Sequence, residues 1–173
     1  MTDAEDQHVC YVRSTTDDNG KAAVLLEWGA LQALLTPAIV LTTGRDLMAA
    51  AAAAETDIAL IETLRKDLRL DDHAIGGMLS AIRARRPAPQ GKPALRIAAV
   101  AGSKTGKPYV TIARGSMKGQ LSPDEARDMA MHWVQTAVAA QIDVRLRYAL
   151  GEWDRLSMVE IEDLFKLIQE AQR

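Results

Sequence analysis

The sequence matches itself at an offset of 86 residues. Without gaps, this offset aligns Gly20-Lys21 with Gly106-Lys107, and Leu35-Thr36-Pro37 with Leu121-Ser122-Pro123. Apolar positions continue the match further along the chain, for example Ile75 with Ile161. Glycines and a proline in matching turns are harder to obtain by chance than matching leucines, so the repeat indicates one structural unit present twice. Chance similarity between two Ala-rich helical sequences is the alternative.

Each unit opens with a predicted pair of strands. In the first copy these are residues 9–13 and 22–28, and the Asn19-Gly20 step between them is a strong hairpin signal. In the second copy they are residues 95–100 and 109–114, with β-branched residues enriched in the later strand. A short segment after Gly29 or Gly115 is a candidate third strand.

A long helix follows the strands in each copy. Thr36-Pro37 and Ser122-Pro123 each place a hydroxyl at the N-cap and a proline at the first helical position. The second of these helices is predicted to run to about residue 150, with an apolar stripe formed by Met129, Trp133, Ala137, Ala140, Val144 and Tyr148. In the first copy Thr42-Thr43-Gly44 is a weak run for a helix, and we expect an interruption there.

A second, shorter helix closes each copy. Ser157 and Glu160 have the spacing of a capping box, and the helix after them has an apolar face formed by Ile161, Leu164, Phe165 and Ile168. In the first copy Asp71 or Asp72 is the expected cap, and the corresponding face is Ile75, Met78, Leu79 and Ile82.

These elements predict an α+β protein that is a tandem duplication of a β-hairpin plus two-helix unit. Residues 1–86 form the first copy (ββαα), residues 87–93 a Pro-rich linker, and residues 94–173 the second copy (ββαα). A unit of about 80 residues is near the size at which a single core is marginal. We therefore expect the copies to associate as an intramolecular pseudo-dimer about a pseudo-twofold axis. Two independent domains are the alternative.

Charge is distributed unevenly along the chain, although the net charge is only −2. Residues 73–123 contain nine basic residues and no acidic residue. Residues 1–72 contain six basic and thirteen acidic residues, and residues 124–173 contain six and ten. This asymmetry bears on binding partners and not on the fold.

The basic stretch gives one candidate site. A cationic ribbon formed by the second hairpin and the linker would track the phosphates of a nucleic acid. Its candidate nucleic-acid-binding residues are Arg85, Arg86, Lys92, Arg96, Lys104, Lys107 and Arg114. A solvated surface balanced by neighbouring acidic helices is the competing interpretation. Aromatic residues make up only 4% of the chain, which disfavours binding of single strands by base stacking.

No recognised catalytic or metal-binding pattern is present. Residues 101–108 resemble a phosphate-binding loop only superficially, because Pro108 stands where Ser or Thr would bind magnesium and a strand is predicted to follow. His8, His73 and His132 are far apart in sequence, and the equivalent residues Asp57 and Asp143 suggest a shared structural contact. We therefore expect no enzymatic activity, no cofactor and no metal.

The segment from Leu121 to Arg127 (LSPDEAR), followed by Ala137 and Asp143, resembles a helix start found in small uncharacterised proteins of actinobacteria and their phages. The first copy departs from this pattern over residues 38–41. The resemblance implies a bacterial or phage setting and no particular activity.

The remaining features concern location. Cys10 is the one cysteine of the chain, lies in an apolar run and is expected to be an inert thiol in a reducing cytoplasm. The acidic N-terminus lacks the features of a secretion signal, and no stretch reaches the roughly 18 apolar residues of a membrane span. We expect a small cytoplasmic interaction protein that binds a protein partner. Nucleic-acid binding is the alternative function, and an enzyme with a site between the two copies is the third. Homo-oligomerisation is left open.

Overall fold

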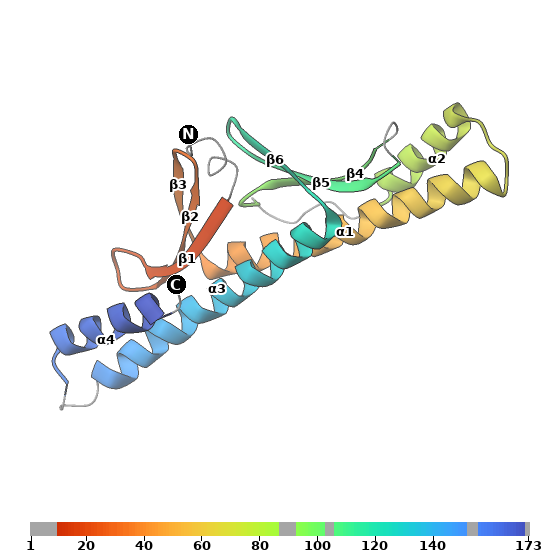
Figure 1. The fold of residues 1–173 in the computed structure, drawn as a ribbon. Coiled ribbons are helices and arrows are strands. Elements are labelled where there is room, and N and C mark those ends of the chain that lie inside the picture. Colours follow the sequence, from red (N-terminus) through yellow and green to blue (C-terminus); the bar gives the residue numbers. More distant parts are fainter. Residues whose placement is uncertain (1–9, 87–92, 103–105, 152–155, 172–173) are drawn as a thin grey trace.

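The computed structural model describes residues 10–86, 93–102, 106–151 and 156–171. They form two three-stranded antiparallel sheets and four helices, so the α+β class is confirmed. Each half of the chain has the same order of elements: three strands, a long helix and a shorter helix (Figure 1). Residues 87–92 of the predicted linker lie outside the described residues.

The first sheet is a meander of β1 (Cys10–Thr16), β2 (Ala22–Trp28) and β3 (Leu31–Leu35). The turn between β1 and β2 is closed by Asp17, whose Oδ1 accepts the backbone N–H groups of Asn19 and Lys21 at 2.9 and 2.8 Å. Gly20 and Gly29 occupy the two turns with φ of 71° and 57°, a region that favours glycine. The third strand means that each unit is larger than the predicted hairpin plus two helices.

The second sheet has the same order, with β4 (Arg96–Ala101), β5 (Pro108–Arg114) and β6 (Met117–Leu121). Val24 pairs with Leu35 in the first sheet and Val110 with Leu121 in the second, so the offset of 86 holds in this part of both sheets. The loop from Ala101 to Pro108 is one residue longer than the loop from Thr16 to Ala22. Strand β4 therefore corresponds to β1 at an offset of 85.

The two long helices are α1 (Pro37–Lys66) and α3 (Pro123–Gly151). Thr36 caps α1 as predicted, accepting the N–H of Ile39, while Ser122 and Glu125 form a reciprocal capping box at α3 with bonds of 3.2 and 2.6 Å. Helix α1 is continuous through residues 42–44, so the expected interruption was wrong.

Hydrogen bonds within α1 and packing against α3 accompany this continuity. The hydroxyls of Thr42 and Thr43 donate to the carbonyls of Ala38 and Ile39, four residues earlier in the same helix. Gly44 is buried where α3 crosses, so its missing side chain is used for close helix packing. Packing of this kind outweighs a weak local helix propensity.

Two shorter helices fold back along the C-terminal parts of the long ones, α2 (Asp72–Ala84) on α1 and α4 (Met158–Ala171) on α3 (Figure 1). Asp71 is the N-cap of α2 and accepts the N–H of Ala74 at 2.8 Å. The predicted capping box of Ser157 and Glu160 is confirmed, with bonds of 3.3 and 2.7 Å.

The main core contains buried residues from both halves. Helix α1 packs against β4 and β5, and helix α3 packs against β1 and β2, so each sheet is covered chiefly by the long helix of the other half (Figure 1). Trp28 from β2 reaches β6, where a Cβ added to Gly119 would lie 3.4 Å from its ring. This shared core is inconsistent with two independent domains.

The predicted apolar faces are buried only where another element covers them. Trp133, Ala137 and Ala140 of α3 are buried, but Tyr148 near the end of the helix is 71% exposed. Met78 of α2 and Leu164 of α4 are also exposed, whereas their neighbours Leu79 and Phe165 are buried. Among the described residues, no helix is long and apolar enough to cross a membrane.

Candidate binding surfaces

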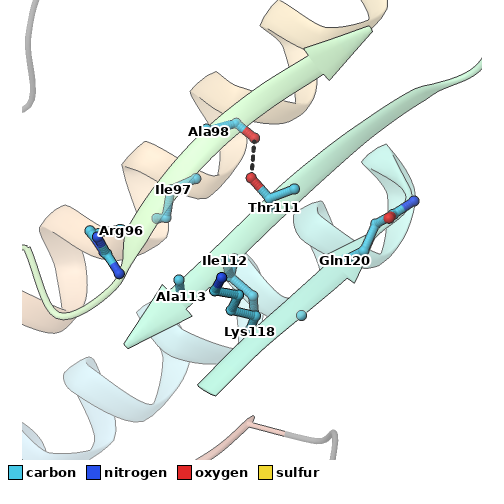
Figure 2. A pocket seen from close by; sticks show the side chains of 9 residues that line it. Arg96, Ile97, Ala98, Thr111, Ile112, Ala113, Lys118 and Gln120 are labelled. Atoms are coloured by element: carbon cyan, nitrogen blue, oxygen red, sulfur yellow. Dashed lines mark hydrogen bonds between the residues drawn. The ribbon is translucent and has the colours of Figure 1, made fainter. Parts of the chain in front are cut away.

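The outer face of the second sheet carries a groove of about 660 Å³ (Figure 2). Two rows of cross-strand neighbours line it: Arg96, Ala113 and Lys118 in one row, and Ala98, Thr111 and Gln120 in the next. The Thr111 hydroxyl lies 3.4 Å from the carbonyl oxygen of Ala98, to which it donates. Ala98 and Ala113 point to this face, because side chains alternate between the two faces of a strand. Their short methyl groups form the floor of the groove.

Two cations stand on opposite sides of this groove. Arg96 comes from β4 and Lys118 from β6, and both side chains are exposed. Neither forms an ion pair with a carboxylate of the described residues. The three strands themselves contain no acidic residue. The two rows on the outer face of the sheet therefore present two cations, two alanines and two hydrogen-bonding side chains, and Ile97, Ile112 and Gly119 complete the lining.

The outer face of the first sheet is different in character. Its corresponding rows are Tyr11, Glu27 and Gln32, and Arg13, Leu25 and Leu34. Arg13 lies 3.7 Å from the carboxylate of Glu27, so its charge is balanced locally. Tyr11 and Leu34 are more than half exposed. The two sheets share a topology but present unlike outer surfaces.

A second surface lies on helix α3. Four large apolar side chains recur at helical spacing along its exposed side, and we call them the α3 ridge: Met131 (51% exposed), Val138 (43%), Ile142 (55%) and Leu146 (40%). Helix α4 adds four further exposed residues, Met158, Val159, Leu164 and Leu167. A row of large exposed apolar side chains along one helix is a candidate site of protein association.

The first half has no equivalent ridge. At the offset of 86, the counterparts of Met131, Val138 and Ile142 are Arg45, Ala52 and Thr56, all exposed on α1. The described parts of α1 and α2 expose only Met48 and Met78 among large apolar residues. The exposed apolar surface is thus concentrated on α3 and α4.

The candidate residues named from the sequence do not form one surface. Arg96 lies on the outer face of the second sheet, but Arg114 points to the other face and donates to the carbonyl of Ala94. Lys107 is exposed at the end of the hairpin loop, and Arg85 is the exposed C-cap residue of α2. Lys92 and Lys104 lie outside the described residues.

Arg86 is engaged elsewhere. Together with Arg83 it binds Asp57, a fully buried carboxylate in α1. Arg83 Nε lies 2.9 Å from Asp57 Oδ2, and Arg86 Nη2 contacts Asp57 Oδ1. The pairing joins the end of α2 to α1. Arg83 lies in the last turn of α2 and Arg86 lies just past the end of that helix. Their shared partner could not be found from the sequence, because Asp57 is 26 and 29 positions away from them.

Sequence reasoning included Lys118 in the basic stretch but not among the candidate binding residues, and it missed Thr111 and Gln120. Strand alternation would have placed Lys118 with Arg96, but only once the pairing register of both hairpins was known.

The thiol of Cys10 is held in its protonated form. Burial raises the pKa of the Cys10 thiol to about 12, an effect that nearby Arg114 partly opposes. Within the described residues, no three His, Cys, Asp or Glu side chains are grouped closely enough to hold a metal ion.

The fold and these surfaces define an α+β protein in which two three-stranded sheets cover a pair of crossed long helices, with a cationic groove on one sheet and an apolar ridge on one helix. No protein-family model, no curated protein and no solved structure matches this chain.

Proposed function

We propose that this chain is a non-enzymatic interaction protein of bacterial or phage type, acting in the cytoplasm, and that it binds a protein partner through the α3 ridge. The observation that carries the proposal is the exposure of Met131, Val138, Ile142 and Leu146 along one side of a helix whose other side is buried in the core. Exposed apolar surface of this kind marks sites of protein association, because covering it removes it from water.

The partner we propose presents an amphipathic helix. The ridge residues are separated by seven, four and four positions, so they form a continuous row along the helix axis. Such a row fits between the side-chain rows of a second helix laid along it.

We also propose that the chain arose by tandem duplication and folds as an intramolecular pseudo-dimer. Three observations support this: the common order of elements, the common register of β2–β3 and β5–β6, and the packing of each long helix on the sheet of the other half. After duplication, one helix would keep an apolar ridge while its counterpart became small and polar at Ala52 and Thr56.

The test compares three forms of the chain as bait in an affinity capture from the native host. These are the wild type, the double variant Val138→Lys with Ile142→Lys, and Thr56→Lys as the matched control on α1. Nuclease treatment removes partners held through nucleic acid. We expect one or more proteins to be retained by the wild type and the control and to be lost with the double variant.

The retained protein is then titrated against purified wild type and variants. Sedimentation of the purified chain alone shows whether a second copy is the partner. If the double variant retains the same proteins as the wild type with undiminished affinity, the α3 ridge is not the binding surface and the proposal fails.

A further inference from the structure

We propose that the groove on the outer face of the second sheet binds the phosphodiester backbone of a double-stranded nucleic acid, which goes beyond the protein-binding function proposed above. The argument rests on three properties of the groove: its charge, its width and its lining.

The charge of the groove is positive on both sides. Arg96 on β4 and Lys118 on β6 face each other across Ala113, and neither is paired with a carboxylate of the described residues. A phosphate chain lying along β5 would pass between these two cations. Neutralising phosphates releases condensed counterions, which is the main source of non-specific affinity for nucleic acids.

The width suits one phosphodiester strand. Arg96 and Lys118 sit two strand spacings apart, which is about 10 Å in a sheet. Ala113 between them is short, so the polymer can approach the floor of the groove. In the next row Thr111 and Gln120 supply hydroxyl and amide groups, which commonly contact phosphates and sugars.

The lining favours a duplex over a single strand. None of the nine residues that line the groove is aromatic, so unpaired bases find no stacking surface there. A duplex requires no such surface, because its bases are already stacked and its phosphates face outward. The first sheet cannot substitute for the second, since Glu27 stands where Ala113 lies in the second sheet.

The experiment measures fluorescence anisotropy of labelled DNA and RNA duplexes of mixed sequence with the full chain over a series of salt concentrations. For two phosphate contacts, the slope of log affinity against log salt contains a contribution of about −2. Arg96→Ala and Lys118→Ala should each reduce the magnitude of that slope by about one, and the double variant should bind at least about tenfold more weakly at low salt.

Two control variants sharpen the result. Arg96→Lys keeps the charge and should keep the slope, while Arg13→Ala removes an exposed cation from the outer face of the other sheet and should leave it unchanged. Weakened binding of either duplex by the groove variants supports the proposal. It is overturned if neither duplex binds at low salt, if the Ala variants bind like wild type, or if single strands bind more tightly than duplexes.

Discussion

Gly44 of α1 lies directly against Ala130 of α3, the residue 86 positions later in the chain. A Cβ added to Gly44 would lie 3.1 Å from the carbonyl oxygen of Ala130 and 3.0 Å from a methyl carbon of Val134. In a twofold-symmetric pair, residues near the axis touch their own equivalents. The contact between positions 44 and 130 is therefore where we place the pseudo-twofold axis of the proposed pseudo-dimer.

The close contact at Gly44 predicts that a larger side chain there lowers the stability of the protein. Gly44→Val should destabilise the protein by about 1–3 kcal/mol, because the branched side chain would push α3 away from α1. Gly77→Ala in α2 is the matched control, since a Cβ there meets nothing within 4 Å. It should stabilise the protein by up to about 1 kcal/mol through helix propensity. Urea unfolding measures the stability of both variants. Similar midpoints for the two would contradict the close contact of α1 with α3 at Gly44.

The pairing of Asp57 with Arg83 and Arg86 predicts an unequal response to mutation. Asp57 is fully buried, while the two arginine side chains are 40% and 31% exposed. Removing both arginines with Ala leaves a buried charge without a partner, which should cost about 3–5 kcal/mol. Asp57→Asn leaves two cations that water can reach, and should cost about 1–3 kcal/mol.

Thermal and urea unfolding test this order of effects. Asp143→Asn is the control, because the counterparts of Arg83 and Arg86 in the second half are Gln169 and Gln172. Equal losses for the arginine double variant and for Asp57→Asn would show that Asp57 is hydrated in solution.

Cys10 should react slowly in the native protein. Burial raises the pKa of its thiol to about 12, so almost no thiolate, the reactive form, is present near neutral pH. The unfolded chain ionises at its ordinary value, so this group stabilises the fold below that value and loses its contribution as pH rises towards 12. Labelling with a thiol reagent at pH 8 should be slow in buffer and fast in urea. Equal rates would contradict the burial.

The two capping-box glutamates should contribute to the loss of stability at acid pH. Backbone N–H donation from Ser122 and Ser157 lowers the pKa of Glu125 and Glu160 respectively. A lowered pKa contributes stability above the unfolded value, about 4.3, and this contribution is lost as pH falls through the folded value. Replacing both by Gln should flatten the loss of stability between about pH 5 and pH 3 in urea titrations. If the double variant loses stability with falling pH as steeply as the wild type, the capping hydrogen bonds of these glutamates are not formed in solution.

Local features were predictable from the sequence, because local chemistry determines them. Thr36, Asp71 and Ser157 cap the helices that their side chains predict, and Gly20 occupies the predicted turn. Short-range hydrogen bonds and backbone preference decide these positions without help from the rest of the fold.

Features that depend on distant residues were not predictable. Residues 42–44 read as a helix break because nothing local reveals that α3 packs onto Gly44. The residues of the predicted cationic ribbon are divided between two faces for a similar reason: Arg96 pairs with Ala113, which puts Arg114 on the opposite face of the sheet. A single-residue difference in loop length decides that register, and register decides which side chains share a face.

The proposal that the α3 ridge receives a protein helix is tested most directly by photo-crosslinking in the native host. A benzophenone amino acid is placed at Ile142, or at its counterpart Thr56 on α1, in the otherwise unchanged chain. Position 142 should give a discrete crosslinked product that disappears when Val138→Lys is added, and position 56 should give none. The same product from both positions, or no product from position 142, would contradict the proposal.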